Sequence, residues 1–371
     1  MRSSHAHHPS QGFSLIELMI ALALGLVIVL GVTDLFVDSS RTQRDVSRTS
    51  RQLENSRFAL DLLASELALV GYWGEADYPV VADDPNFGPL RVAEMAGEAV
   101  TGYPSPQLPC VGSGKEGRDP RVELGWAMEY PLVSGLGVDL EVAMSSAACD
   151  GTISPPKDTE EFVAIRRAST CATDSSGGVG CAPIGNFFHL QTNGCYDPNQ
   201  ELTGGEIKLH RVTEVDVDSV LNYRNFSCRS ALSDRAPVYR YVSRIYYVNH
   251  RDELVRLELA ESNIYEETVL VEGVEALRFE WFIDRSSDGD YDVTRSVADN
   301  DWSEEARTND WPNVVGVNMS MIVRSSIPEP GYRDTNIYQL PGQTWVNHND
   351  DYTRLLRSRT VELFNVAGRR R

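Results

Sequence analysis

The chain contains 371 residues, 42% of them hydrophobic, which is enough to build one large domain or two ordinary ones. Its formal net charge of −20 at pH 7 argues against nucleic acid as a partner, because nucleic-acid-binding proteins usually present a basic face. The sequence also lacks the HExxH, GxSxG and Walker-type glycine motifs that position catalytic groups, so we do not expect an enzyme.

The first element is an apolar segment, residues 13–33, which follows Gly12 and contains Glu17 as its only charged residue. Its 21 residues suffice to cross a bilayer core of roughly 30 Å at about 1.5 Å per residue. A secretory signal peptide would place its small-residue cleavage site after the apolar run, whereas Gly12 comes before it. Cleavage at Gly12 would therefore leave the membrane helix on the mature chain, with Phe13 as the new amino terminus.

The octapeptide GFSLIELM, residues 12–19, resembles the type III signal of type IV pilins and pseudopilins. The resemblance implies that a prepilin peptidase cuts between Gly12 and Phe13 at the cytoplasmic face of the inner membrane and methylates the Phe13 amine. It also implies that the Glu17 carboxylate pairs with the positive amino terminus of a neighbouring subunit during assembly. Such a pair would offset the cost of a carboxylate inside a membrane. The alternative is that Glu17 reaches the membrane interface from near the helix end.

The arginines around this segment conflict with the orientation that the signal implies. Only Arg2 precedes the span, whereas Arg41, Arg44, Arg48 and Arg51 follow it. By the positive-inside rule the C-terminal side would be cytoplasmic. We nevertheless predict a periplasmic head, because the cleavage motif must meet a peptidase at the cytoplasmic face and the cysteines favour an oxidising compartment.

Residues 34–72 continue as a helix with an amphipathic pattern, since no proline occurs between the span and Pro79. A seam of mostly apolar side chains recurs at steps of three and four residues: Val46, Thr49, Leu53, Ser56, Leu60, Leu63, Leu67 and Val70. The two polar members, Thr49 and Ser56, disfavour a strong two-stranded coiled coil. We therefore expect this face to pack on the protein's own head.

The end of this helix carries two motifs, NSRFALD at residues 55–61 and GYWG at residues 71–74. Together they resemble the PilW family of minor pilins, in which an N-x-R-F-A-L-D-type helix runs into a G-Y-W-G turn. Gly71 and Gly74 can adopt the left-handed or turn geometry at which a helix stops. We expect Tyr72 and Trp73 to pack as aromatic core where the helix meets the head.

Residues 73–235 form a region rich in Pro, Gly, Asp and Ser, with short strand-like runs at 160–166 and 206–212. All six cysteines lie in this region: Cys110, Cys149, Cys171, Cys181, Cys195 and Cys228. Their even number favours disulfides, and the absence of a CxxC pair disfavours a zinc ribbon or a thioredoxin-like site. Many connectivities are possible, and only short spacing favours the pairing of Cys171 with Cys181. We expect a loop-rich, disulfide-stapled insertion.

From residue 236 onward the pattern is that of β-strands. Residues 239–248 are rich in aromatic and β-branched side chains, and after a polar stretch residues 254–259 place Leu254, Arg256 and Glu258 opposite Val255, Leu257 and Leu259. The two runs predict a hairpin. Further strands are expected at residues 268–271, 276–283, 314–325 and 360–364. The last strand resembles the family's T-V-x-L-R-N ending only in part, because Phe364 stands where that Arg would be. The resemblance implies an α+β, type IV pilin-like fold, in which one long helix lays its apolar face on an antiparallel sheet.

An acidic loop between two of these strands has the spacing of a calcium-binding loop. Its candidate ligands are Asp284, Ser286, Asp288, Asp290 and Asp292, with Gly289 supplying the sharp turn. Arg295 occupies the position at which a bidentate Glu would complete an EF-hand-like shell, so Asp299 or Asp301 would have to supply the last ligand. PilW-like sequences carry a similar D-x-D-x-D-G segment, which favours calcium, the one cofactor that we consider. The alternative is a solvated turn built from Asp, Ser and Gly.

These observations divide the chain into five segments: a leader peptide (1–12), a transmembrane helix (13–33), an amphipathic periplasmic helix (34–72), the cysteine-containing region (73–235) and the antiparallel β-sheet head (236–371). The resemblance implies a minor pilin that joins other minor pilins and the major pilin in a tip or priming complex of the type IV pilus. Its large head is a candidate carrier of a PilY-type adhesin. Two alternatives use the same anchor, namely a type II secretion pseudopilin and a membrane-anchored surface module that acts as an adhesin.

Overall fold

The computed structural model describes residues 14–74, 110–112, 120–128, 130–145, 149, 153–173, 186–195, 207–212, 220–225, 227–229, 235–261, 263–299, 302–345 and 349–367. The chain divides into two compact units, Met1–Arg51 and Gln52–Arg371. Helix α1, Leu15–Ala68, contributes to both units. Gly71 and Gly74, which follow the helix, both have positive φ angles, of 72° and 77°, so the predicted left-handed turn is confirmed.

In the second unit, α1 buries one face against the head. The buried residues recur every three or four positions: Gln52, Ser56, Ala59, Leu60, Leu63, Ala64 and Leu67. Packing on the protein's own head is therefore confirmed for this part of the seam. Leu53 is an exception, because its side chain is 37% exposed. The neighbouring Gln52 points to the head instead, and its amide donates a hydrogen bond of 2.8 Å to the Thr353 carbonyl.

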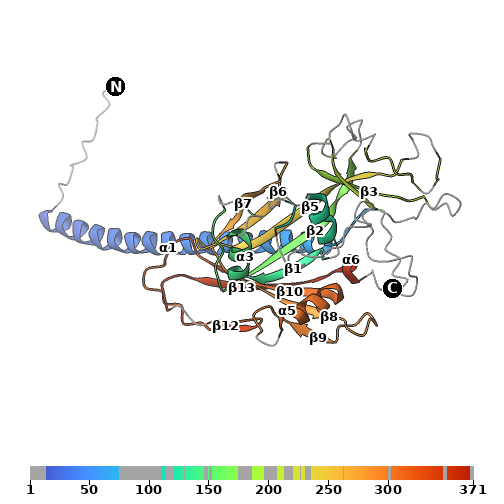
Figure 1. Cartoon of the computed structure of the whole chain (residues 1–371). Coiled ribbons are helices and arrows are strands. Elements are labelled where there is room, and N and C mark those ends of the chain that lie inside the picture. The colour runs from blue at the N-terminus through green and yellow to red at the C-terminus, as the bar shows by residue number, and fades with distance from the viewer. Residues whose placement is uncertain are drawn as a thin grey trace, which may run out of the picture. The chain divides into compact units, whose positions relative to one another are not determined.

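The first sheet has seven strands, all paired antiparallel. They are β1 (Leu132–Leu136), β2 (Glu161–Thr173), β3 (Phe188–Thr192), β4 (Ile207–Arg211), β5 (Val238–Val248), β6 (Glu253–Leu259) and β7 (Tyr265–Glu272). The order is β1-β2-β5-β3-β4, and β6 pairs with both β5 and β7 (Figure 1). Strands β1 to β4 come from the region expected to be an insertion, so its described part is built into the main sheet.

The second sheet has the order β13-β10-β8-β9 and is also antiparallel. Its strands are β8 (Val274–Ile283), β9 (Val293–Arg295), β10 (Val314–Arg324) and β13 (Arg354–Glu362), and a small hairpin joins β11 (Tyr338–Leu340) to β12 (Gln343–Trp345). Short helical elements complete the described part: α2 (Pro120–Ala127), α3 (Gly137–Ser145), α5 (Glu304–Asp310), η3 (Trp311–Asn313) and α6 (Phe364–Ala367).

The main hydrophobic core lies between α1 and the two sheets. Alternate side chains of a strand share one face, which explains why Leu277, Phe279 and Trp281 of β8 all enter this core. They meet Leu63 and Leu67 of α1, and fully burying each such side chain contributes about 2 kcal/mol. The first sheet supplies Val163, Ile165, Tyr246 and Val248, and β10 supplies Val317, Met319 and Met321.

A second core lies on the opposite face of the first sheet, where Tyr241, Ile245 and Leu257 pack with Trp73. The Trp73 ring stacks on the Tyr241 ring, with 5.8 Å between centroids, and Tyr72 packs edge-on against Tyr239. The expected aromatic packing at the helix end is thus confirmed. A Cβ at Gly74 would lie 2.5 Å from the Tyr239 ring, so the turn requires glycine for space as well as for its backbone angle.

Most predicted strands are confirmed within one to three residues. The expected hairpin corresponds to β5 and β6, and the next expected strands correspond to β7, β8 and β10. The last prediction, residues 360–364, was displaced, because β13 begins at Arg354 and Phe364 already starts α6. Three arginines in β13 lower its hydrophobicity and hide its alternation in the sequence.

Candidate functional site

The N-terminal end of α1 forms half of a capping box. The backbone N–H of Ser14 donates a hydrogen bond of 3.1 Å to Glu17 Oε2, and the N–H of Leu18 bonds to the Ser14 carbonyl. Glu17 therefore satisfies a free N–H of its own helix while its side chain remains exposed. Gly12 and Phe13 lie outside the described residues, so cleavage and methylation stay predictions.

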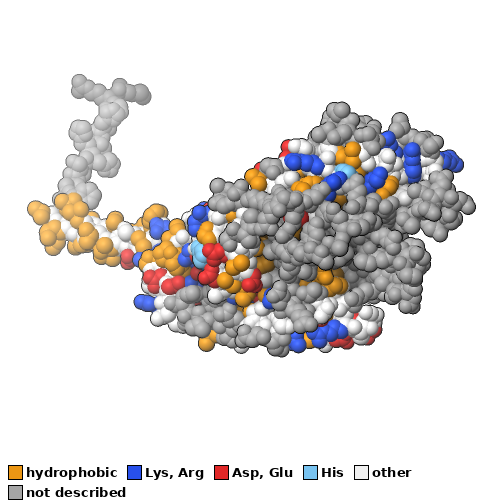
Figure 2. Space-filling model, viewed as in Figure 1, with side chains coloured by type: hydrophobic (Ala, Val, Ile, Leu, Met, Phe, Trp, Pro, Cys, Tyr) orange, Lys and Arg blue, Asp and Glu red, His pale blue; other side chains and the backbone are white. Residues whose placement is uncertain are grey.

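The beginning of α1 is apolar enough to cross a membrane by length and composition. An 18-residue window of this helix reaches a mean hydropathy of 2.8, and none of the window is buried within the protein. Figure 2 shows hydrophobic side chains exposed along this part of α1. Water-exposed apolar surface of this kind needs a cover, which a lipid bilayer or neighbouring helices would provide.

Glu66 is the main polar link between α1 and the first sheet. Its Oε1 lies 2.6 Å from Arg244 Nη1 and 3.2 Å from Arg167 Nη2. Arg244 also donates to Glu258 Oε1 at 3.0 Å, and Arg240 reaches the same oxygen at 3.3 Å. Burial would raise the pKa of Glu258, but the hydrogen bond from Arg244 lowers it below its ordinary value. These contacts fix the position of the helix along the sheet.

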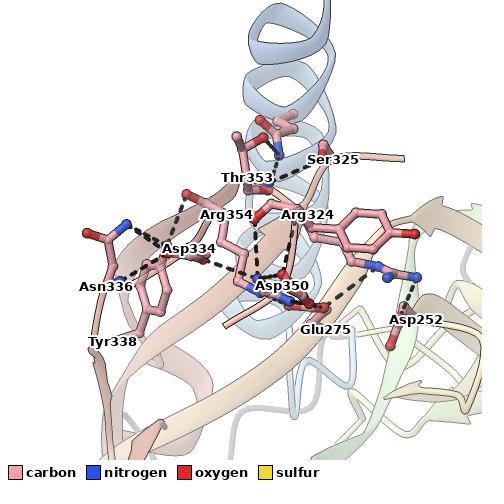
Figure 3. Close-up of polar contacts among 12 residues, drawn as sticks. Asp252, Glu275, Arg324, Ser325, Asp334, Asn336, Tyr338, Asp350, Thr353 and Arg354 are labelled. Carbon is pink, nitrogen blue, oxygen red and sulfur yellow. Dashed lines mark hydrogen bonds and ion pairs between the residues drawn. The ribbon is translucent and has the colours of Figure 1, made fainter. Parts of the chain in front are cut away.

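A second polar cluster surrounds Arg354, which is only 1% exposed at the start of β13 (Figure 3). Its guanidinium lies 2.5 Å from Glu275, 3.1 Å from Asp334 and 2.7 Å from Asp350. Burial would lower the pKa of Arg354, but the carboxylates of Asp350 and Glu275 raise it above its ordinary value, so the side chain stays charged.

The Arg354 cluster extends to the turn between β5 and β6 through Arg324 of β10. Arg324 Nη2 lies 2.8 Å from Asp252 Oδ2, and its Nε lies 3.7 Å from Glu275. Asp252 also pairs with Lys157. Figure 3 shows Asp252, Glu275, Arg324 and Asp350 converging near Arg354. The cluster therefore joins the two sheets at one end of the α1 face.

Two adjacent carboxylates at the start of β2 make a third connection between the sheets. Glu160 accepts the N–H of Leu277 at 2.9 Å, and Glu161 accepts the N–H of Phe279 at 3.0 Å. Glu160 also pairs with Arg278, whose guanidinium lies 3.0 Å away and is 1% exposed. These carboxylates satisfy N–H groups of β8 where β9 does not extend. Burial raises the pKa of Glu161 to about 7.

The acidic loop uses its carboxylates to hold its own backbone. Asp284 accepts the N–H groups of Ser287 and Gly289, at 2.6 and 3.0 Å, and Asp292 accepts those of Arg285 and Ser286. Desolvation would raise the pKa of Asp284, but the bonds from Gly289 and Ser287 lower it below its ordinary value.

Ser286 bridges Asp284 and Asp292, which brings these two predicted ligands together. Asp288 Oδ1 bonds to the Asp290 N–H, and the Asp288 and Asp290 side chains are exposed. Across the described residues, no group of three or more His, Cys, Asp or Glu side chains is placed to hold a metal ion. The structure therefore gives this loop a structural role, and calcium binding stays a prediction.

The structure pairs Cys110 with Cys149 and Cys195 with Cys228. Cys171 is also disulfide-bonded, whereas Cys181 lies outside the described residues, so the pairing of these two stays a prediction. Each described bridge closes a loop of more than 30 residues, with sequence separations of 39 and 33. Cross-links of this length restrict the unfolded chain and stabilise the fold.

The sequence analysis missed the charged residues that connect the helix and the sheets. In the sequence, Glu66, Glu161 and Arg354 look like ordinary surface residues of an amphipathic pattern. The partners of Glu66 and Glu161 lie roughly 100 residues or more away along the chain. One signal could have revealed part of this set. Arg278 stands between Leu277 and Phe279, and a charge flanked by apolar side chains in a strand is seldom buried without a partner.

Two protein-family models match the chain, one near its N-terminus and one near its C-terminus. Residues 241–365 match the family model for Type IV Pilus-assembly protein W, and residues 8–33 match the prokaryotic N-terminal methylation motif. The chain is a PilW-type minor pilin. The PilW match runs from β5 to α6 and includes Arg244, Glu275 and Arg354, whereas Glu66 and the β2 carboxylates lie before it. The methylation motif covers Gly12, Phe13 and Glu17.

The comparison with solved structures found a type IV-like pilin from Thermus thermophilus. It is 18% identical over 34% of this chain and 70% of that one, with a TM-score of 0.22. The assignment as a PilW-type pilin depends on the family matches, because this structural likeness is too low to support it. No curated protein matches the chain.

Proposed function

We propose that this chain helps to initiate type IV pilus assembly as part of a tip or priming complex with other minor pilins. The observation that carries the proposal is the presence of a methylation motif and a PilW match on one chain. The methylation motif marks an N-terminal helix that would assemble with other subunits in the membrane. The PilW match marks a head that resembles those of pilus-assembly proteins. The role requires binding and positioning but no catalytic group.

In this proposal the Glu17 carboxylate changes its partner during assembly. In the isolated chain it accepts the Ser14 N–H at the end of its own helix. Cleavage before Phe13 would create a positively charged amine on each subunit, and an ion pair between Glu17 and a neighbour's amine is stronger in a membrane than a bond to a neutral N–H. Close van der Waals packing of α1 against neighbouring helices supplies the remaining binding energy.

The head would lie in the periplasm and then at the pilus tip, where the disulfides suit an oxidising compartment. There it would contact other minor pilins, and the major pilin would follow this complex in the pilus. A PilY-type adhesin is a candidate partner of the head. The family description, Type IV Pilus-assembly protein W, favours this assignment over a type II secretion pseudopilin. Deleting the gene distinguishes the two, because loss of twitching with normal enzyme secretion fits only the pilus.

The assembly step is tested with Glu17→Val and Gly12→Val in cells. We expect both variants to be missing from sheared pili and piliation to fall, because each removes a group that assembly needs. Ser14→Ala is the matched control, since it alters the same helix end and keeps both the carboxylate and the cleavage site. Normal piliation with Glu17→Val would refute the proposed contact, provided that the melting temperature of the purified variant equals that of wild type.

A further inference from the structure

Two strands of the head lie at open sheet edges. Strand β13 pairs with β10 along all nine residues, and β7 pairs with β6, but neither has a second neighbour among the described strands. The side chains of residues 357–360 in β13 are all exposed, and so are Glu266, Thr268 and Val269 of β7. An open edge presents a row of N–H and C=O groups that can pair with another strand.

The two edges carry opposite charges. Strand β13 contains three arginines and one glutamate in a chain of net charge −20, whereas β7 contains three glutamates and no basic residue. Arg354 is fully used inside the protein and Arg359 pairs with Asp61, but no described residue forms an ion pair with Arg357. On β7, Glu267 bonds to Ser154, whereas the Glu266 side chain is exposed. Phe364, 63% exposed, adds an apolar contact just after β13.

The two edges also run in opposite directions along α1. Gln52 contacts Thr353, Asp61 contacts Arg359 and Asn365 contacts Ala68, so β13 runs parallel to the helix. On the other edge, Asn55 contacts the Glu272 carbonyl. Glu66 accepts a hydrogen bond from Arg244, which also bonds to Glu258, the residue opposite Glu266. Strand β7 therefore runs antiparallel to the helix over the same stretch.

We propose that β13 of one copy pairs with β7 of a second copy as an antiparallel extension of the sheet. When two heads stand side by side with parallel helices, their β13 and β7 edges lie at the same height and run in opposite directions, as antiparallel pairing requires. Arg357 and Arg359 would then lie beside the half of β7 that ends at Glu272, because Asn55 and Asp61 place these residues at neighbouring heights along α1. The inference goes beyond the proposed function and depends on it only for the common membrane orientation of the two copies.

The proposal is tested by photo-crosslinking of the full chain, purified in detergent from cells that lack the other pilins. A benzophenone amino acid replaces Ser358 on β13, and a variant with the same probe at Val142, an exposed position on α3, serves as the control. We expect a crosslinked dimer only from the β13 probe, with the adduct on residues 265–272 of the second copy. Monomer alone, or an adduct elsewhere, would overturn the proposal.

Charge reversal supplies a second measurement. We expect Arg357→Glu to lower the dimer yield roughly fivefold, because an exposed attraction is lost and a repulsion is added. The further change Glu272→Arg should restore the yield. Arg229→Glu alters the net charge equally at an exposed site in another part of the head and should leave the yield unchanged. Equal losses for both arginine variants would show a general charge effect and overturn the specific pairing. The crosslinking is done on protein from cells that lack the other pilins. A negative result in the piliation tests of the proposed function would therefore not change what the dimer yields show.

Discussion

Glu161 makes the stability of the head depend on pH. Its carboxyl is fully buried at the junction of the two sheets, and burial raises its pKa from 4.5 to about 7, although Arg278, Ser296 and the Phe279 N–H partly offset this. A raised pKa in the folded state means that the protonated form is favoured by folding. The stabilisation is therefore complete below pH 4.5 and is lost as the pH rises through about 7.

The size of the effect follows from the shift. Each pKa unit corresponds to about 1.4 kcal/mol, and between pH 5 and pH 8 the contribution of Glu161 to the free energy of unfolding falls by about 2–3 kcal/mol. Glu161→Gln removes the titration, although one hydrogen bond to Ser296 or Phe279 is also weakened. That second loss does not depend on pH, so the two effects can be separated.

The assay is urea unfolding of the full chain in detergent at several pH values between 5 and 8. We expect the free-energy difference between Glu161→Gln and wild type to shift by about 2–3 kcal/mol in favour of the variant as the pH rises. Glu272→Gln, at an exposed position on β7, should follow wild type at every pH. Parallel curves for wild type and Glu161→Gln would refute the assignment of a raised pKa to this carboxyl.

Three further predictions concern stability. Arg354→Met should lower the free energy of unfolding by about 3–5 kcal/mol in urea melts, because it leaves Asp334 buried without its cation and Glu275 with only the more distant Arg324; an effect below about 1 kcal/mol would contradict the cluster in Figure 3. Leu63→Ala should cost about 2–5 kcal/mol by opening a cavity between α1 and both sheets, whereas Leu53→Ala at the exposed position should cost less than about 1 kcal/mol. The sequence prediction of calcium binding implies that millimolar calcium raises the melting temperature of wild type but not of Asp292→Asn; no rise in wild type would rule it out.

The sequence predicted much of the fold because the relevant signals are local. The apolar run of α1 and the glycines at its end each specify a conformation through neighbouring residues. Strands β5, β6, β8 and β10 were found for the same reason, since each shows its apolar or alternating pattern within a few consecutive residues. The prediction for β13 was poorer, because its arginines serve an edge and a buried cluster rather than a core face.

Some residues of the candidate site could be predicted from the sequence, whereas their contacts could not. Gly12, Phe13 and Glu17 form a contiguous motif, so the sequence alone identified the end that the methylation family matches. The calcium-like spacing was equally visible, but spacing does not determine whether carboxylates face a metal or their own backbone, and the structure assigns Asp284 and Asp292 to backbone N–H groups.

By itself, then, the sequence determined a membrane helix with a prepilin signal and a β-rich head, because periodicity and short motifs act over a few residues. Only the tertiary structure decided how the helix is fixed to the head. Gln52 and Thr353 are 301 positions apart, and the partners of Glu66 and Arg354 are brought together only when both sheets close on α1. A charged side chain carries no local sign of whether it will be solvated or buried with a partner, since its neighbours in space are chosen by the packing of the whole chain.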